Sequence, residues 1–239
     1  MSAILDVRQL SRRFGGLVAV DGVSFALQSG TVTALIGPNG AGKTTCFNML
    51  GGALAPSGGD ILFRGQAVER LPAHRRARLG IGRTFQVAAT FRSMTVTENV
   101  ETALMAAGRE LADVPALLEA VGIGAAGARL VAELPYGDVK RLELAMALAA
   151  EPTLLLLDEP TAGMASGERR AIMETVTRLA AEHGTTLLFT EHDMDAVFGF
   201  ATRVLVMDQG RLIADGAPDA VRADTHVRAV YLGEEDGDA

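Results

Sequence analysis

The sequence predicts an α/β fold whose core is assembled from both ends of the chain, with a helical lobe inserted between them. Short apolar runs with polar or acidic ends are typical of parallel strands buried on both faces, and they occur as "TVTALIG" (31–37), "TLLLLDE" (153–159) and "TTLLFTEHD" (185–193). The region from about 87 to 150 is instead rich in Ala and Leu with a helical period. These observations place the lobe between two halves of one sheet.

Composition limits the function classes. A chain of 239 residues, 49% hydrophobic and 21% charged, can bury a substantial core, and its net charge of −7 argues against a general affinity for nucleic acid. The single cysteine, Cys46, excludes an internal disulfide, and we assign it no chemistry. With no signal segment and no uncharged apolar run of bilayer length, we expect a chain that does not cross a membrane by itself. We interpret the basic residues Arg75, Arg76 and Arg78 as a solvated helix face.

The remaining elements follow from local signals. Thr95 and Glu98 form a capping-box signature for a helix that starts there, and Pro152 stops the last helix of the lobe. A helix between the second and third apolar runs gives a β-α-β order. The predicted strands are 3–10 and 60–65, the predicted helices are 43–52, 95–107, 113–123, 139–150 and 167–184, and a hairpin over 203–216 turns at Gln209 and Gly210.

"GPNGAGKT" (37–44) satisfies the phosphate-loop pattern G-x-x-x-x-G-K-[ST] between a predicted strand and a predicted helix. Its glycines let backbone N–H groups converge on phosphate oxygens, and the helix N-terminus adds its dipole. We expect Lys43 to bridge the β- and γ-phosphates, Thr44 to bind Mg²⁺ and Thr45 to donate to the α-phosphate. The alternative, a Gly-rich turn with a surface Lys, does not explain the flanking elements. The predicted nucleotide-binding residues here are Gly37, Asn39, Gly40, Ala41, Gly42, Lys43, Thr44 and Thr45.

Acidic and imidazole side chains follow the other two buried strands, at the edge where open α/β sheets bind ligands. We expect Asp158 to be a metal residue that orients a Mg²⁺-bound water, and Glu159 to polarise the attacking water. A helix-capping acidic pair is the alternative. His192 ends the third strand at the same edge, which favours a γ-phosphate sensor over a structural histidine.

Five ordered motifs, "GPNGAGKTT", "GRTFQ", "LPYGDVKRLELA", "LLLLDEPTAG" and "FTEHD", resemble the Walker A, Q-loop, signature, Walker B and H-loop motifs of the ATP-binding cassette of ABC transporters. The resemblance runs from about Leu5 to Gly233. "RFGGLVAVDGVSF", "GIGRTFQ", "EPTAGM" and "VRAVYLGEE" further resemble the branched-chain (hydrophobic) amino-acid importer ATPases. The implied fold is a RecA-like P-loop NTPase core with an antiparallel β subdomain over 1–86 and 151–216, a helical signature subdomain over 87–150, and a C-terminal helix with an acidic tail over 217–239.

The resemblance also assigns roles to residues that spacing alone does not single out. It implies that Phe14 stacks on adenine, with strand packing as the alternative, and that Val20 lies under the ribose and base. It implies that Gln86 touches Mg²⁺ or the attacking water and links the core to the helical lobe. After it, Val87, Phe91 and Met94 fall where membrane subunits dock in the family, although packing within the lobe is an equal alternative for Val87.

The implied function is ATP hydrolysis with Mg²⁺, coupled to import of a branched-chain or other hydrophobic amino acid. The implied partners are integral-membrane permease subunits, a second ATP-binding cassette and an extracytoplasmic solute-binding protein, with no nucleic acid. The chain would lie peripherally on the cytoplasmic face of the inner (cell) membrane. One alternative is a soluble ABC-type ATPase acting on ribosomes or nucleic-acid complexes, whose usual second cassette and long inserts are not visible here. An unrelated P-loop kinase or GTPase would lack the signature and H-loop motifs.

Two segments depart from the family pattern. "LPYGD" replaces the common LSGGQ, which in the family contacts the γ-phosphate held by the other subunit, and Pro135 has neither hydroxyl nor N–H for that contact. Gly137, which follows Tyr136, and the helix end near Asp138 can still present the positive end of the helix dipole to phosphate. The Asp138 side chain is expected to cap its own helix. Ala165 replaces an Asp or Asn that ties the two subunits together. Both ATP sites would then be weaker, or the chain would contribute one good and one poor half-site to a heterodimer.

Overall fold

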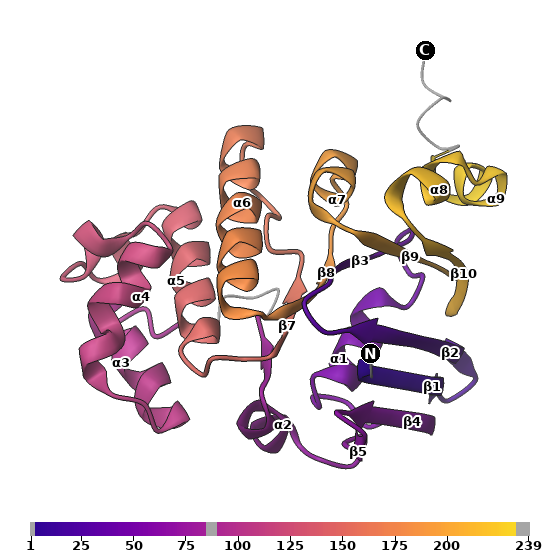
Figure 1. The fold of residues 1–239 in the computed structure, drawn as a ribbon, viewed down its shortest axis with the longest axis horizontal. Coiled ribbons are helices and arrows are strands. Elements are labelled where there is room, and N and C mark those ends of the chain that lie inside the picture. Colours follow the sequence, from indigo (N-terminus) through magenta and orange to yellow (C-terminus); the bar gives the residue numbers. More distant parts are fainter. Residues whose placement is uncertain (1–2, 85–89, 233–239) are drawn as a thin grey trace.

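The computed structural model describes residues 3–84 and 90–232, and it contains two sheets (Figure 1). A six-stranded sheet runs in the order β10-β9-β3-β8-β7-β6, parallel except for β10 at its edge, and a four-stranded antiparallel sheet runs in the order β2-β1-β4-β5. The strands are β1 (Ala3–Phe14), β2 (Leu17–Gln28), β3 (Val32–Ile36), β4 (Gly58–Phe63), β5 (Gln66–Ala67), β6 (Ile81–Arg83), β7 (Leu154–Asp158), β8 (Thr186–Thr190), β9 (Arg203–Asp208) and β10 (Arg211–Gly216). The predicted α/β fold class is confirmed.

The leucine run of β7 shows why the six-stranded sheet is the centre of the molecule. Successive side chains of a strand point to opposite faces, so Leu155 and Leu157 enter one core while Leu154 and Leu156 enter the other. In strand β8, Phe189 likewise enters the first of these cores and Leu188 enters the second. Both faces of the sheet are therefore covered, which fixes the register of each parallel strand and the position of its carboxyl end.

Helix α1 (Lys43–Leu50) lies between the two sheets (Figure 1). Its buried side chains Cys46, Phe47, Met49 and Leu50 share one core with residues of both sheets. Burial raises the pKa of the Cys46 thiol to about 12, which agrees with a purely structural role. Because α1 is held on two sides, the loop that precedes it has a rigid support.

The short helix α2 (Ala73–Leu79) corrects the interpretation of the basic run. Arg75 and Arg78 are exposed, but Arg76 is 1% exposed. Its guanidinium donates to the carbonyl oxygens of Met49 (2.6 Å) and Leu50 (2.8 Å) at the end of α1. Terminal helix carbonyls lack partners within their own helix, so a buried guanidinium satisfies them. The prediction of a fully solvated face was therefore wrong for Arg76.

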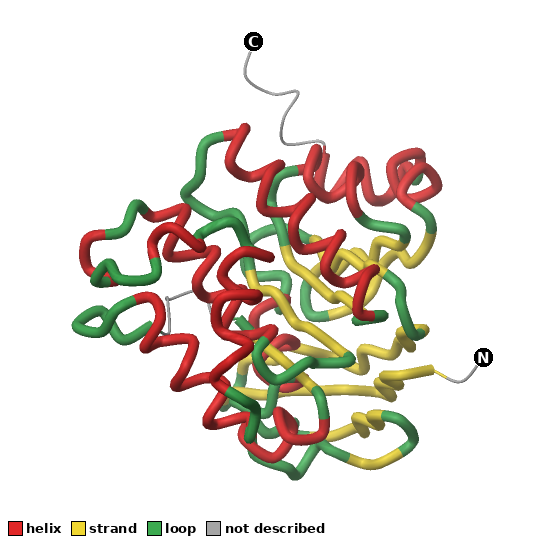
Figure 2. Tube along the Cα trace, turned by 60° about the vertical axis from the view of Figure 1, so that its left-hand side comes forward, coloured by secondary structure: helices red, strands yellow, loops and turns green. Residues whose placement is uncertain are grey.

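Between β6 and β7 the chain forms the helical lobe, which gathers on one side of the six-stranded sheet in both views (Figures 1 and 2). The predicted capping box is confirmed, since the Thr95 hydroxyl accepts from the Glu98 N–H and the Glu98 carboxylate accepts from the Thr95 N–H. The lobe consists of α3 (Val96–Ala107), η1 (Leu111–Asp113), α4 (Val114–Ala120), η2 (Gly124–Ala126), η3 (Val131–Glu133) and α5 (Tyr136–Leu148).

The C-terminal third completes the β-α-β order and the predicted hairpin. Helix α6 (Ser166–His183) joins β7 to β8, and α7 (Met194–Phe200) joins β8 to β9. The chain then continues through α8 (Pro218–Ala223), α9 (Thr225–Val227) and η4 (Arg228–Leu232). Among the helices of the described residues, none combines the length and apolar character that a membrane crossing needs.

Candidate nucleotide site

The phosphate loop joins β3 to α1 in a conformation that only small residues allow. A Cβ at Gly37 would collide with the Met207 carbonyl oxygen, and one at Gly42 (φ 100°) would collide with the Ala19 carbonyl oxygen. Within the loop, Lys43 Nζ donates to the carbonyl oxygens of Gly37 (2.5 Å) and Pro38 (3.0 Å). Burial lowers the pKa of Lys43, opposed by the charges of Glu159 and Asp158. The loop thus carries a largely buried ammonium within reach of two carboxylates.

The phosphate loop forms one wall of a cavity of about 760 Å³. Lys43, Glu159 and His192 line the same cavity, although they come from three different parts of the sequence. The full lining is Phe14, Leu17, Val18, Ala19, Asn39, Gly40, Ala41, Gly42, Lys43, Thr44, Thr45, Glu159, His192 and Gln209. The structure therefore brings the predicted loop residues 39–45 together with the residues that follow β7 and β8.

The hairpin between β9 and β10 supports the phosphate loop. Gln209 (φ 44°) and Gly210 (φ 80°) form the predicted turn. The Gly210 N–H donates to the Ala41 carbonyl (3.0 Å), and the Gly210 carbonyl accepts from the Asp21 N–H (2.8 Å). The turn thereby ties the phosphate loop to strand β2.

Asp158 is the last residue of β7 and is 2% exposed. Its Oδ1 accepts from the Thr190 hydroxyl (2.9 Å), and its Oδ2 pairs with Arg83 (3.4 Å). The same Arg83 guanidinium donates to the Asn48 side chain on α1 (2.8 Å). Burial lowers the pKa of Arg83, and the charge of Asp158 opposes that shift. Asp158 is therefore held as a charge-balanced carboxylate at the carboxyl edge of the sheet.

Glu159 and His192 contact each other at the mouth of the cavity. Glu159 Oε1 lies 2.9 Å from His192 Nε2, with side-chain exposures of 20% and 45%. Glu159 has a positive φ of 49°, and its N–H donates to the Thr190 hydroxyl (3.0 Å). A left-handed conformation at a non-glycine residue is costly and is maintained only where neighbours enforce it. Here it turns the carboxylate out of the strand and into the cavity.

Phe14 and Val20 occupy different positions relative to the cavity. The Phe14 ring is 45% exposed and lines the cavity, with the Arg12 guanidinium 4.6 Å from its centroid. Val20 is fully buried and packs beneath Gly42, so Val18 and Ala19 form the wall where Val20 was expected. Gly37 likewise contributes its carbonyl to Lys43 without lining the cavity.

Two residues that the sequence singled out, Gln86 and Val87, lie outside the described residues. Of the neighbouring apolar residues, Phe91 is 50% exposed. Met94, which lies just before α3, is less exposed and partly buried. An exposed Phe91 on the lobe leaves the docking hypothesis open for this segment.

The signature segment lies apart from the cavity of its own chain. Helix α5 begins at Tyr136, earlier than expected, with Pro135 as its N-cap residue. Asp138 falls inside the first turn and makes no capping hydrogen bond, so its predicted capping role was wrong. Tyr136 instead packs near Gly163, and Gly137 lies near Glu168. None of the four residues 135–138 lines the cavity that holds Lys43.

The donor set at the cavity fits a magnesium nucleotide. Backbone N–H groups and an ammonium suit phosphate, and the Thr44 hydroxyl in the cavity lining is an oxygen ligand of the kind Mg²⁺ prefers. The Asp158 carboxylate is a second such ligand, but it does not line the cavity, and its oxygens contact Thr190 and Arg83. In the described part of the chain, no group of three or more His, Cys, Asp or Glu side chains could hold a metal. Phosphate oxygens would therefore have to complete the coordination.

Sequence reasoning missed several residues of the site. Leu17, Val18 and Ala19 line the cavity at the start of β2, where the register against β1 shifts between Arg12 and Arg13. The alternation of side chains cannot reveal such a shift. Arg83 was also missed, although its position in "GRTFQ" beside Gln86 was a usable signal.

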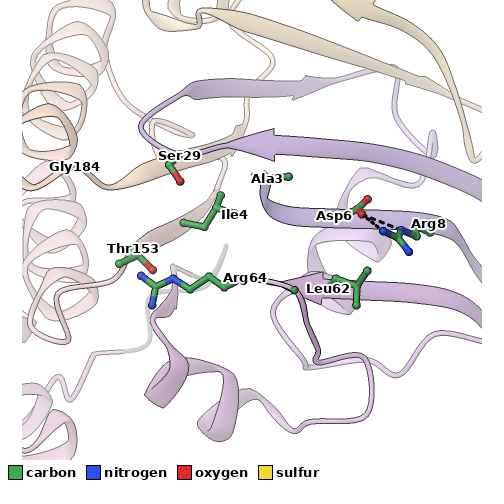
Figure 3. A pocket seen from close by; sticks show the side chains of 10 residues that line it. Ala3, Ile4, Asp6, Arg8, Ser29, Leu62, Arg64, Thr153 and Gly184 are labelled. Atoms are coloured by element: carbon green, nitrogen blue, oxygen red, sulfur yellow. Dashed lines mark hydrogen bonds and ion pairs between the residues drawn. The ribbon is translucent and has the colours of Figure 1, made fainter. Parts of the chain in front are cut away.

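A second hollow, of about 540 Å³, lies away from this chemistry (Figure 3). Thr153 and Gly184 lie there just before β7 and β8 begin, so the hollow is at the opposite end of the parallel strands. It includes the ion pair of Asp6 and Arg8 (2.6 Å) and no residue predicted to bind nucleotide.

A phosphate loop, a buried acidic strand end and a glutamate–histidine contact around one cavity define a nucleotide-hydrolysing P-loop protein. The family model described as ABC transporter matches residues 20–162, and that described as branched-chain amino acid ATP-binding cassette transporter matches residues 211–237. The chain belongs to the ABC transporter family and is one of its ATP-hydrolysing subunits. Such subunits dimerise and work with membrane permease subunits.

Relatives and a solved structure also support this family assignment. The chain is 41% identical to the high-affinity branched-chain amino acid transport ATP-binding protein LivG of Escherichia coli K12 and 38% identical to BraF of Pseudomonas aeruginosa, each over 97% of this chain and 98% of the relative. It is 35% identical to the lipopolysaccharide export system ATP-binding protein LptB of Escherichia coli K12, over 98% of both chains. A nucleotide-free ATP-binding cassette superposes with a TM-score of 0.88 at 31% identity, covering 96% of this chain and 99% of its own.

Proposed function

We propose that this chain powers import of a branched-chain or other hydrophobic amino acid. The observation that carries the proposal is the match of residues 211–237 to the branched-chain amino acid cassette model. The higher identity to the two amino-acid transport relatives, at 41% and 38%, than to the lipopolysaccharide export relative, at 35%, supports the same substrate class. A soluble ATPase acting on ribosomes or nucleic-acid complexes is not favoured by these relatives.

In the proposed complex the chain lies on the cytoplasmic face of the cell membrane. It contacts integral-membrane permease subunits, with Phe91 as one candidate contact, and pairs head to tail with a second cassette. An extracytoplasmic solute-binding protein delivers the amino acid, and nucleic acid takes no part. The net charge of −7 supports the last point.

Within each cassette, the proposed division of labour follows the cavity. Phe14 stacks on adenine, the loop 37–45 holds the phosphates and Lys43 bridges the β- and γ-phosphates. Glu159 polarises the attacking water and His192 contacts the γ-phosphate; their 2.9 Å contact supports this pairing.

Thr44, Gln86 and Asp158 would hold Mg²⁺, which when bound would neutralise phosphate charge. The partner's segment of Pro135, Tyr136, Gly137 and Asp138 would lie near the γ-phosphate, and the Gly137 N–H and the helix end would make the contact, because Pro135 has no N–H and the Asp138 carboxylate would repel phosphate. Their separation from the cavity of their own chain supports contact in trans. Nucleotide binding would then close the dimer and hydrolysis would reopen it.

The test is transport by the native complex. The chain is purified with its membrane subunits and reconstituted into proteoliposomes that enclose Mg·ATP with the cassette inside. Labelled Leu, Ile and Val are supplied outside with the native solute-binding protein. We expect uptake of these amino acids, no uptake of Lys or Glu, and loss of uptake in Glu159→Gln. Recovery of the chain with ribosomes and without membrane subunits, or uptake unchanged in Glu159→Gln, would overturn the proposal.

A further inference from the structure

Residues 190–193, at and just after the end of β8, are joined through side chains to the end of β7 and to the segment that follows it. The backbone ladder between these strands ends at the pair Asp158 and Thr190. Beyond that pair, no ladder hydrogen bond within the described residues sets the distance between the two segments. Side-chain hydrogen bonds link the two segments there, and the first is made by the Thr190 hydroxyl, which accepts from the Glu159 N–H (3.0 Å) and donates to Asp158 Oδ1 (2.9 Å).

Glu191 supplies a second buried connection, and it is the one that reaches the His192 backbone. Its carboxylate accepts from the Thr161 hydroxyl (2.7 Å) and the Thr161 N–H (2.9 Å) on one oxygen, and from the His192 N–H (3.3 Å) on the other. Glu191 is 3% exposed and Thr161 is 1% exposed. Burial raises the pKa of Glu191, and these three donors oppose the shift. A buried hydrogen bond of this kind is shielded from exchange with water.

The connections made by Asp193 and by the His192 ring are more open to solvent. Asp193 pairs with Arg169 of α6 at 2.9 Å, but the side chains are 20% and 35% exposed. The contact between His192 and Glu159 is itself partly exposed and lies where nucleotide is proposed to bind. Exposed ion pairs contribute little because solvent screens them. Among the connections made by residues 191–193, that of Glu191 is therefore the one best able to fix the position of His192.

We infer that Glu191 is a positioning residue for ATP hydrolysis: its carboxylate holds the His192 backbone and the loop at Thr161 together, and so sets His192 against Glu159. The inference rests on the proposed roles of Glu159 and His192.

Chemistry predicts which substitutions break the connection. Gln at position 191 keeps the volume, but its amide has one acceptor oxygen, so its NH₂ would face either Thr161 or the His192 N–H. Thr161→Val removes the hydroxyl donor and keeps the shape, whereas Thr161→Ser retains the donor. Thr185→Val is a matched control, because Thr185 is also buried and its hydroxyl donates to Pro152 (2.8 Å) at the other end of β8.

The experiment measures ATP hydrolysis, ATP affinity and histidine NMR signals on the full chain, with hydrolysis also measured in its membrane complex. We expect Glu191→Gln and Thr161→Val to lower kcat about tenfold with the ATP Kd within about twofold. The double variant should be no worse than either single one. Thr161→Ser and Thr185→Val should keep normal kcat. Only the ring signals of His192, among the four histidines, should shift in Glu191→Gln.

Normal kcat in both Glu191→Gln and Thr161→Val would overturn the inference. So would an equal loss in Thr185→Val, or unmoved His192 signals. If Glu191→Gln does not fold, the comparison of Thr161→Val with Thr161→Ser decides the question. The NMR measurement needs no hydrolysis. Failure of the positioning role is therefore distinguishable from failure of the catalytic role, which is tested by Glu159→Gln.

Discussion

The cavity around Lys43 and the signature segment at 135–138 differ in how their chemistry is held. In the cavity, each key side chain has partners in its own chain, as with Lys43 in the phosphate loop and Glu159 against His192. The signature segment has an exposed Pro135 at its helix end and no capping side chain. The difference teaches that the residues around Lys43 are organised within one chain, and it agrees with the proposed action of the signature segment on a second subunit.

The largest effect is expected from Lys43→Ala. Loss of charge-assisted hydrogen bonds to phosphate, at about 1.5–3 kcal/mol each, should weaken ATP binding about a thousandfold. Titration with a fluorescent ATP analogue measures this loss. Binding as tight as in the unmodified chain would show that the loop is not the phosphate site.

Lys140, the second of the chain's two lysines, provides a comparison with Lys43. Lys140 forms a buried ion pair with Glu143 at 2.9 Å in the signature helix, with side-chain exposures of 5% and 6%. Removing one partner of a buried ion pair is strongly destabilising, so Lys140→Met should lower the free energy of unfolding by about 3 kcal/mol. Urea denaturation measures the loss, and ATP affinity of the folded variant should be normal. A thousandfold loss of affinity here as well would erase the distinction between the two regions.

Phe14→Ala should have a smaller effect. Base stacking on an aromatic ring is worth about 1–3 kcal/mol, so ATP affinity should fall about tenfold or more with kcat little changed. Leu17→Ala is the control, because Leu17 lines the same cavity with an exposed aliphatic side chain. An equal loss in both variants would mean that general apolar contact, and not stacking, binds the base.

The smallest effect is expected in the signature segment. Pro135→Ser restores a hydroxyl and an N–H at the helix end, and one net hydrogen bond is worth about 1 kcal/mol. We therefore expect ATPase activity of the assembled complex to rise about fivefold, with ATP affinity of the separate chain unchanged. A rise in affinity of the separate chain would place this segment in its own site instead of the partner's.

Sequence reasoning succeeded where chemistry is local. The phosphate loop, the strand end at Asp158 and the capping box at Thr95 each depend on a few adjacent residues, and the structure forms the corresponding elements. Sequence reasoning failed where contacts with distant segments determine whether a side chain is buried. Arg76 is buried against carbonyl oxygens at the end of α1, and Val20 is buried beneath Gly42 of the phosphate loop. No local pattern contains either fact.

The most direct test of the central claim, that this chain hydrolyses ATP with Glu159 as the residue that activates water, is ATP turnover by Glu159→Gln in the assembled complex. The account predicts that kcat falls at least about a hundredfold while ATP still binds with normal affinity, because the loop around Lys43 is intact. Turnover equal to that of the unmodified chain would contradict it.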